Sequence, residues 1–326
     1  MPKLHIDTDL GGDIDDLCAL AMVLNWPDAE LLAVTTVAEH EGKRAGYVRY
    51  VLGLADREDI PVAAGADVSL DCYRSWQGLP DEKVYWPEPI TPVETSLDQA
   101  LSLLERSIEQ GAIIVAIGAF TNLALLEKRS PGILRHAKIY LMGGYLFPPR
   151  EGFPQWGDEM DFNVQIDVQS ANYVIEHSSP TFVPLAVTVE TSLRRANLAR
   201  LKQAGPVARL IAKQAEAFAT DENYEARYGQ TCEGLPEDII NFLHDPLACA
   251  IALGWREGVE ISEIALKSEI KHGWLYHAID ASGKPTQVVT RVDSDKFNDL
   301  WLRTVAHQSS VSPVSCAEQI VAGEPR

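Results

Sequence analysis

Residues 1–24 read MPKLHIDTDLGGDIDDLCALAMVL and place five aspartates within ten positions, from Asp7 to Asp16. The apolar residues of Leu4–Asp9 predict a short buried strand, and those of Asp15–Trp26 recur at the spacing of a helix. Gly11 and Gly12 let the chain turn tightly between the two. This stretch therefore predicts a strand–turn–helix unit with its acidic residues gathered at the carboxyl end of the strand.

The same alternation of strand and helix continues along the chain. We expect further strands at Leu31–Val37, Ile60–Ala64, Ala112–Gly118, Ile139–Met142, Phe182–Val187 and Ile261–Leu266, and a hairpin over Trp274–Val292 with its turn at ASGKP. Further helices are expected at Arg44–Leu54, Leu97–Ile108, Asp167–His177, Pro206–Ala219, Asp245–Leu253 and Ser294–Ala306, the second with Thr95 or Ser96 as its N-cap. Repeated βα units predict one α/β domain over residues 1–326, with a mainly parallel, mixed central sheet flanked by helices. In such a sheet a ligand binds beyond the carboxyl ends of the strands.

Residues 67–94 break the alternation. They are rich in Pro, Trp and Tyr, including Trp76, Tyr85 and Trp86, and they show no clear period. A long connection of this kind is often functional. We therefore interpret this segment as a surface excursion and a candidate lid.

Composition excludes several classes of protein. Charged residues are 23% of the 326 positions and the formal net charge is −19, without a dense basic patch, so nucleic acids and anionic membranes are poor partners. The longest apolar run, Ala112–Phe120, is too short to cross a membrane. Because Met1 leads almost directly into a charged turn motif, we expect no secretory signal. The five cysteines lack a CxxC spacing, which favours free thiols and a cytoplasmic location; they are Cys18, Cys72, Cys232, Cys249 and Cys316.

The aspartates themselves suggest a cation. Asp7 and Asp9 are alternate strand residues and share a face, while Asp15 and Asp16 begin a helix. Carboxylates this close raise one another's pKa unless a cation is present, and a hard divalent ion such as Ca²⁺ or Mg²⁺ takes oxygen ligands. The alternative is a helix N-cap with solvated acids. An EF-hand is excluded, because glycine occupies its fifth position and Cys18 its closing position.

Three further motifs follow strands or begin helices. GAFTN (118–122) leaves loop carbonyls and a threonine free to face a ligand, or is an ordinary βα turn. DFN (161–163) pairs a carboxylate with an amide, which suits sugar hydroxyls, or forms an Asx turn. HDPLA (244–248) begins an apolar helix with Pro in its first turn, so that its Asp is either a ligand or an N-cap.

Taken together, the acidic motif, GxxTN, xFN and HDPLA, in this order, resemble the nucleoside hydrolase family of the inosine/uridine-preferring type. The resemblance covers nearly the whole chain, with LLAVTTV, LMGG and VDSDKFNDLWL as supporting segments. It implies a single α/β domain with one Ca²⁺ at the carboxyl edge of the sheet. It also implies a cytoplasmic homodimer or homotetramer that acts on a nucleoside.

The resemblance also implies roles for individual residues. Asp9, Asp16, Asp245 and the backbone carbonyl of Thr121 look like the calcium ligands. Asp7 looks like a supporting residue. The positions that would bind the sugar are Asp15, Asp161 and Asn163.

The chemistry implied is calcium-dependent hydrolysis of the N-glycosidic bond of ribonucleosides. The reaction builds positive charge on the ribose ring, which nearby carboxylates stabilise. Asp9 would take the proton of a water as general base. His244, whose ordinary pKa lies near neutrality, is the candidate acid or leaving-group contact. Tyr224 and Tyr228 are candidates to stack on the base or hydrogen-bond to it.

The sequence departs from the family pattern in ways that bear on the substrate. Asp13 and Ile14 lengthen the acidic loop, so Asp13 competes with Asp15 and Asp16 for their roles. His40 stands where many members have Asn and is a further substrate-binding candidate, and Asp161 is one methylene shorter than the usual Glu. The alternatives are a non-catalytic nucleoside- or ribose-binding protein, a hydrolase of another N-glycoside, and a phosphatase-like fold with an Asp nucleophile. The last leaves GAFTN, DFN and HDPLA unexplained.

Overall fold

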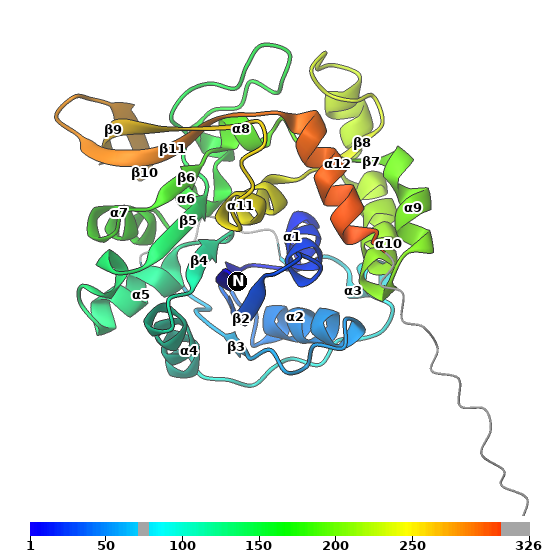
Figure 1. Cartoon of the computed structure of the whole chain (residues 1–326), viewed down its shortest axis with the longest axis horizontal. Coiled ribbons are helices and arrows are strands. Elements are labelled where there is room, and N and C mark those ends of the chain that lie inside the picture. Colours follow the sequence, from blue (N-terminus) through cyan, green and yellow to red (C-terminus); the bar gives the residue numbers. More distant parts are fainter. Residues whose placement is uncertain (71–77, 308–326) are drawn as a thin grey trace, which may run out of the picture.

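The computed structural model describes residues 1–70 and 78–307. Within these ranges, nine strands form the central sheet in the order β10-β9-β11-β6-β5-β4-β1-β2-β3 (Figure 1). The strands are β1 (Lys3–Thr8), β2 (Glu30–Thr36), β3 (Val62–Ala64), β4 (Ile113–Ala116), β5 (Lys138–Met142), β6 (Thr181–Val183), β9 (Val259–Lys271), β10 (Trp274–Ile279) and β11 (Lys284–Val292). Neighbours from β11 to β3 pair in parallel, and β9 runs antiparallel to both β10 and β11. The predicted single α/β domain with a mainly parallel, mixed sheet is confirmed.

Helices cover both faces of this sheet (Figure 1). On one face α4, α5 and α7 enclose a core with the strands, and on the other α1, α2, α10, α11 and α12 enclose a larger core. The helices are α1 (Asp15–Leu24), α2 (Lys43–Leu54), α3 (Glu82–Tyr85), α4 (Leu97–Glu109), α5 (Thr121–Arg129), α6 (Phe162–Gln165), α7 (Val168–His177), α8 (Leu185–Thr188), α9 (Leu198–Gln203), α10 (Pro206–Asp221), α11 (His244–Ala252) and α12 (Ser294–Val305). Short turns are η1 (Ile133–Arg135), η2 (Asp158–Met160), η3 (Arg195–Asn197) and the π-helical η4 (Glu225–Gly229). In the described chain no helix is long and apolar enough to span a membrane.

The strand order puts a topological switch beside β1. The chain runs from β1 to β2 and β3 on one side, and β4, β5 and β6 follow on the other. The connections that follow β1 and β4 therefore run to opposite sides of the sheet. Open α/β sheets bind ligands at such a point, beyond the carboxyl ends of the strands. The acidic loop is the segment 9–14 between β1 and α1. It lies next to the GAFTN loop after β4, since a Cβ on Gly118 would lie 2.9 Å from Asp9 Oδ1.

Most expected elements are present, and their local signals explain them. Ser96 is the N-cap of α4 in a capping box with Gln99, whereas Thr95 accepts a hydrogen bond from Ala64 N instead. A short antiparallel pair, β7 (Ser192–Arg194) with β8 (Ile239–Phe242), escaped the sequence analysis and carries the HDPLA motif at its end.

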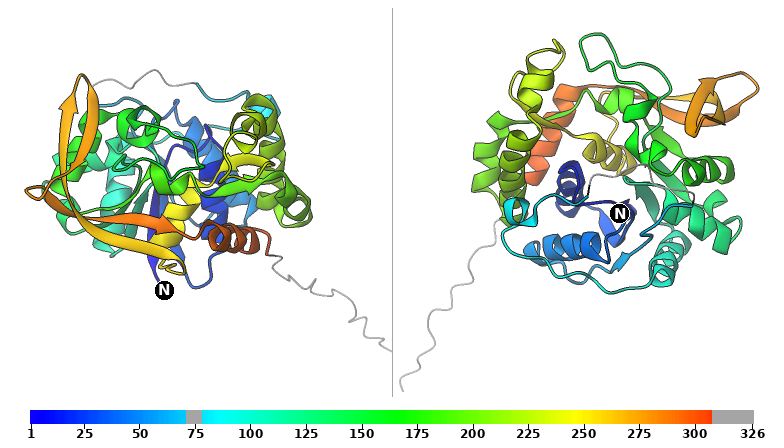
Figure 2. Two further views of the ribbon diagram at one scale, coloured as in Figure 1. Left: turned by 90° about the horizontal axis from the view of Figure 1, so that it is seen from above. Right: turned by 180° about the vertical axis from the view of Figure 1, so that it is seen from behind.

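The hairpin expected over Trp274–Val292 is wrong. β10 and β11 do not pair with each other; both pair with β9, which lies between them and is longer than the Ile261–Leu266 expected. The tight turn is at His272–Gly273, both with positive φ, and it joins β9 to β10. This hairpin projects from one side of the molecule (Figures 1 and 2).

Two other expectations need correction. The strand expected at Phe182–Val187 ends at Val183, because Pro184 has no N–H for the ladder and its carbonyl starts α8 instead. Residues 78–94 are not wholly a surface excursion: Tyr85 and Trp86 are buried, and Trp86 stacks on Tyr47 with ring centroids 4.3 Å apart. Trp76 lies outside the described residues, as do Cys72 and Cys316. The role of this segment as a lid stays a prediction. Among the described cysteines, Cys18, Cys232 and Cys249 are free thiols.

One buried side chain locks α12 against α1, the helix that begins with Asp15 and Asp16. Trp301 is 1% exposed and its indole Nε1 donates to the Cys18 carbonyl over 3.2 Å. We predict that Trp301→Ala lowers the free energy of unfolding by about 3–5 kcal/mol, through the cavity it leaves. Arg303→Ala, an exposed change on the same helix, should cost under about 0.5 kcal/mol. Urea denaturation measures both, and equal losses would contradict this account.

Candidate active site

Buried carboxylates from three segments gather where β1 meets α1 and α11. The carboxylate oxygens of Asp15, Asp16 and Asp245 lie within 4.8 Å of one another, and each residue is at most 5% exposed. Asp9 is also buried, and its charge acts on all three. The sequence analysis named these four residues, and the structure brings them together. We call them the acidic cluster.

Burial and mutual repulsion dominate the electrostatics of the acidic cluster. Burial raises the pKa of Asp15, Asp16 and Asp245 well above the usual range, and the neighbouring carboxylates raise it further. Burial also raises the pKa of Asp9, while the charge of Arg44 lowers it. A group of this kind is costly to ionise unless a cation sits among the oxygens.

Hydrogen bonds hold the acidic loop in shape. Thr8 Oγ1 donates to Asp16 and also accepts from Leu10 N, which ties the strand end to the helix start. Asp13 Oδ1 accepts from Ile14 N at 2.5 Å and from the side chain of Asn241 on β8. Asp13 thus connects the lengthened loop to β8, and its charge also raises the pKa of Asp15 and Asp16.

Asp7 lies on β1, two residues before Asp9, and its supporting role stays a prediction. It is fully buried, and its Oδ1 accepts from Thr35 Oγ1 at 2.6 Å and Asn122 Nδ2 at 2.8 Å. Burial raises its pKa to about 7. Asn122, from the GAFTN motif, also donates to Thr36 O, so it ties the start of α5 to both β1 and β2.

The predicted sugar-binding pair lies at the ends of β4 and β5. Asp161 Oδ2 accepts from Gly144 N at 2.7 Å, and burial raises the pKa of this carboxyl to about 7. Asn163 Nδ2 donates to the carbonyls of Ile117 and Met142, both at 3.1 Å, so that its amide oxygen is the atom left for a ligand. One oxygen of the Asp161 carboxylate therefore holds the Gly143–Gly144 turn after β5.

Thr121 and His40 are less directly placed. The Thr121 hydroxyl donates to Asp167 Oδ2, next to α7, at 2.6 Å. The role of the Thr121 backbone carbonyl as a calcium ligand stays a prediction. His40 is exposed and follows Glu39 in the loop before α2. Glu39 was missed: it is buried and accepts hydrogen bonds from Thr36 Oγ1, Arg44 N and Ala45 N.

Aromatic side chains from three distant segments form a wall around His244. Its centroid lies 5.2 Å from that of Phe242 and 6.3 Å from that of Trp156. Tyr224 and Tyr228 stack edge to face at 4.9 Å, and each lies 5.6 Å from Phe242. We call these five residues the aromatic wall. The two tyrosines and His244 were predicted, whereas no local pattern indicated Trp156 or Phe242.

His244 differs electrostatically from the sequence-based expectation. Its Nδ1 shares a hydrogen bond of 2.7 Å with Thr188 Oγ1, and burial lowers its pKa to about 3. The imidazole is therefore neutral near pH 7. The argument from an ordinary imidazole pKa does not apply to this half-buried ring.

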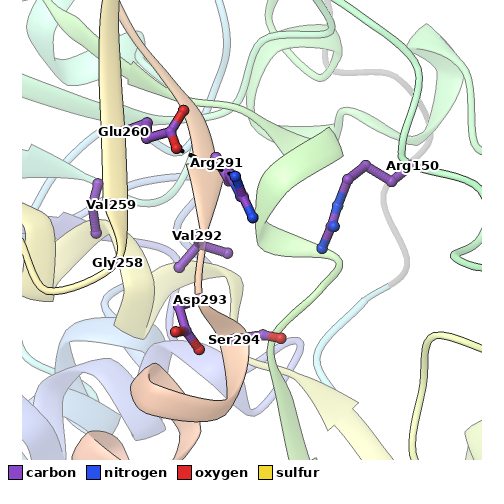
Figure 3. Close-up of a pocket in the computed structure, with 8 residues that line it drawn as sticks. All are labelled: Arg150, Gly258, Val259, Glu260, Arg291, Val292, Asp293 and Ser294. Atoms are coloured by element: carbon purple, nitrogen blue, oxygen red, sulfur yellow. Dashed lines mark hydrogen bonds and ion pairs between the residues drawn. The ribbon is translucent and has the colours of Figure 1, made fainter.

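One cavity of the described residues lies away from the acidic cluster. It holds about 460 Å³ and is lined by residues around the start of α12, including Arg150, Arg291 and Glu260 (Figure 3). Arg291 forms a salt bridge with Glu260, and Arg150 forms one with the buried Glu190. This cavity contains none of the predicted site residues.

Comparison with known proteins now identifies the family. The model of the inosine-uridine preferring nucleoside hydrolases matches residues 4–299. The chain belongs to this family. It is thereby an N-glycosyl hydrolase.

Curated relatives and solved structures agree with this assignment. The chain is 31% identical over 303 residues to the pyrimidine-specific ribonucleoside hydrolase RihA of Klebsiella pneumoniae subsp. pneumoniae, covering 89% of this chain and 88% of the relative. A plant nucleoside hydrolase, PpNRh1, superposes with a TM-score of 0.76 at 19% identity, covering 94% of this chain and 99% of that one. The purine-preferring ribonucleoside hydrolase of Gardnerella vaginalis gives 0.76 at 21% identity, covering 93% and 98%. The two structures show that the fold is that of a nucleoside hydrolase.

The acidic loop of this nucleoside hydrolase depends on a glycine. Gly11 has φ of 113°, and a Cβ there would lie 2.5 Å from the buried Tyr47 ring. We predict that Gly11→Ala destabilises the protein by at least about 2 kcal/mol and lowers activity more than 10-fold. Gly111→Ala is the matched control, because its φ is also positive but its Cβ would meet open space. Chemical denaturation and initial rates measure both, and equal loss of activity would contradict the prediction.

The raised carboxyl pKa values predict a pH dependence. Groups such as Asp7 and Asp161, with a pKa of about 7, bind protons in the folded state more tightly than in the unfolded state. These carboxyls make the metal-free protein less stable as pH rises from about 4 through 7, and with the raised acidic cluster they outnumber His5, His244 and His277, whose lowered pKa values act in the opposite sense. Thermal denaturation in chelator at pH 5.5 and 7.5 tests this, with a lower melting temperature expected at pH 7.5. A higher one would contradict it.

Proposed function

We propose that this enzyme hydrolyses the N-glycosidic bond of ribonucleosides, giving ribose and a free base, with Ca²⁺ bound in the acidic cluster. The observation that carries the proposal is the convergence of three buried carboxylates, Asp15, Asp16 and Asp245, within 4.8 Å. The names of the relatives support a ribonucleoside as substrate: one is pyrimidine-specific and another purine-preferring.

The donor set fits calcium. Ca²⁺ takes six to eight oxygen ligands, and the cluster offers carboxylates alone. Asp9, Asp16, Asp245 and the Thr121 carbonyl are the proposed ligands. Asp15 belongs to the same group of oxygens, so we propose that it faces both the ion and a ribose hydroxyl.

The residues of this chain then have separate tasks. When bound, calcium supplies a Lewis acid that orients the ribose diol and favours deprotonation of water. Asp9 accepts the proton of the attacking water. Asp15 and Asn163 hold ribose hydroxyls, and the buried carboxylates stabilise positive charge that develops on the ring.

The aromatic wall is the proposed site of the base. Trp156 and Tyr228, both half-buried, offer aromatic faces for stacking beside His244, and the buried Phe242 packs against both of them. A neutral His244, held by Thr188, acts there as a hydrogen-bonding contact to the leaving base rather than as a preformed imidazolium. A homodimer or homotetramer, a role for His40 and a cytoplasmic location stay predictions.

Release of reducing sugar from a panel of purine and pyrimidine ribonucleosides tests the hydrolase. We predict release with calcium, loss in chelator, and a fall of at least about 10³-fold in kcat for Asp9→Ala. Asp295→Ala, an exposed change on α12, is the control and keeps wild-type rates. Calcium-stabilised protein that releases no sugar from any nucleoside would favour a binding protein or another N-glycoside.

The aromatic wall makes its own prediction. Trp156→Ala should raise KM about 10-fold or more, because about 1–3 kcal/mol of stacking with the base is lost. Trp156→Phe, which keeps an aromatic face, should recover much of the affinity. Steady-state kinetics on the preferred nucleoside measure both, and an unchanged KM for Trp156→Ala would place the base elsewhere.

A further inference from the structure

A buried arginine lies directly behind the acidic cluster and has no part in the function described so far. Arg44, in the first turn of α2, is 0% exposed. Its Nε donates to the Ala38 carbonyl at 2.8 Å, and its Nη1 donates to the carbonyl of Asp9. One guanidinium therefore joins the chain after β2 to the acidic loop after β1.

The local structure fixes this arginine in place. Glu39 accepts hydrogen bonds from the backbone N–H groups of Arg44, at 3.2 Å, and Ala45, at 2.8 Å, so it anchors the start of α2. Tyr47 lies three residues on, on the same side of the helix, and its ring packs against Gly11. Arg44 and Tyr47 thus contact the acidic loop at two points, the Asp9 carbonyl and Gly11.

The position of Arg44 matters electrically as well as sterically. A guanidinium stays charged in proteins, and burying it is unfavourable unless anions lie nearby. The charge of Arg44 acts on the carboxylates of Asp9 and Asp16. It is a permanent cation beside carboxylates that otherwise repel one another.

We propose that Arg44 is a positioning residue that acts through Asp9: it fixes the Asp9 backbone and partly neutralises the acidic cluster, so that the loop keeps its shape before a metal ion binds. The inference rests on the proposed function for its effect on catalysis, but its effect on the metal-free protein does not. Lysine cannot replace it fully, because one ammonium group lacks the planar fork that reaches both carbonyls.

Arg49 provides a matched control on the same helix. Its Nη1 also donates to two backbone carbonyls, those of Glu58 at 3.0 Å and Ile60 at 3.3 Å. It differs from Arg44 in two ways: it is only half-buried, and both of these hydrogen bonds are made to residues outside the acidic loop. Arg44→Met and Arg49→Met each remove one positive charge and two hydrogen bonds to backbone carbonyls. Only Arg44→Met removes a charge beside the acidic cluster.

The first test is thermal denaturation in chelator. Arg44→Met should lower the melting temperature by about 5 °C or more, and by more than Arg49→Met, because it leaves the carboxylates without their cation. Arg44→Lys, which keeps the charge, should lose less. Equal losses for Arg44→Lys and Arg44→Met would overturn the proposal.

The second test is kinetic, at saturating calcium. We expect Arg44→Met to lower kcat about 10-fold or more with little change in KM, Arg44→Lys to recover part of it, and Arg49→Met to behave as wild type. An unchanged kcat for Arg44→Met would overturn the proposed action through Asp9. Wild-type protein that shows neither calcium stabilisation nor sugar release would instead contradict the proposed function, while the chelator experiment would still decide the charge-compensating role of Arg44.

Discussion

Mutual repulsion among buried carboxylates is the constraint on which the rest of this site depends. Asp9, Asp15, Asp16 and Asp245 are all kept from water, and burial raises the pKa of each. Left alone, such a group would take up protons or push the chain apart. A protein that holds these carboxylates together must therefore fix the backbone around them by contacts from outside the group.

The clamps come from every side of the acidic loop. Thr8 ties the end of β1 to α1, and Asn241 on β8 holds Asp13. Arg44 and Tyr47 press from α2. Because each clamp belongs to a different element, the geometry of the cluster is a property of the whole sheet edge rather than of one loop.

The side that would bind substrate is built in a contrasting way. The acidic half uses hydrogen-bonded oxygens, while the aromatic wall uses ring packing among Trp156, Tyr224, Tyr228, Phe242 and His244. The proposed ribose side is polar and the proposed base side is aromatic, which matches the two halves of a nucleoside. His244 borders both halves, because it precedes Asp245 and stacks near Phe242.

The sequence by itself determined the βα alternation, the mainly parallel sheet and the acidic cluster, because these follow from short-range period and from motifs that each occupy one loop. It could not determine that β9 lies between β10 and β11, because a turn signal at ASGKP does not say which strand is the partner. Nor could it reveal Arg44, which looks like any polar residue on a surface helix until α2 packs against the acidic loop. The aromatic wall and the neutral state of His244 also belong to the tertiary structure alone, because packing and burial arise only when distant segments meet.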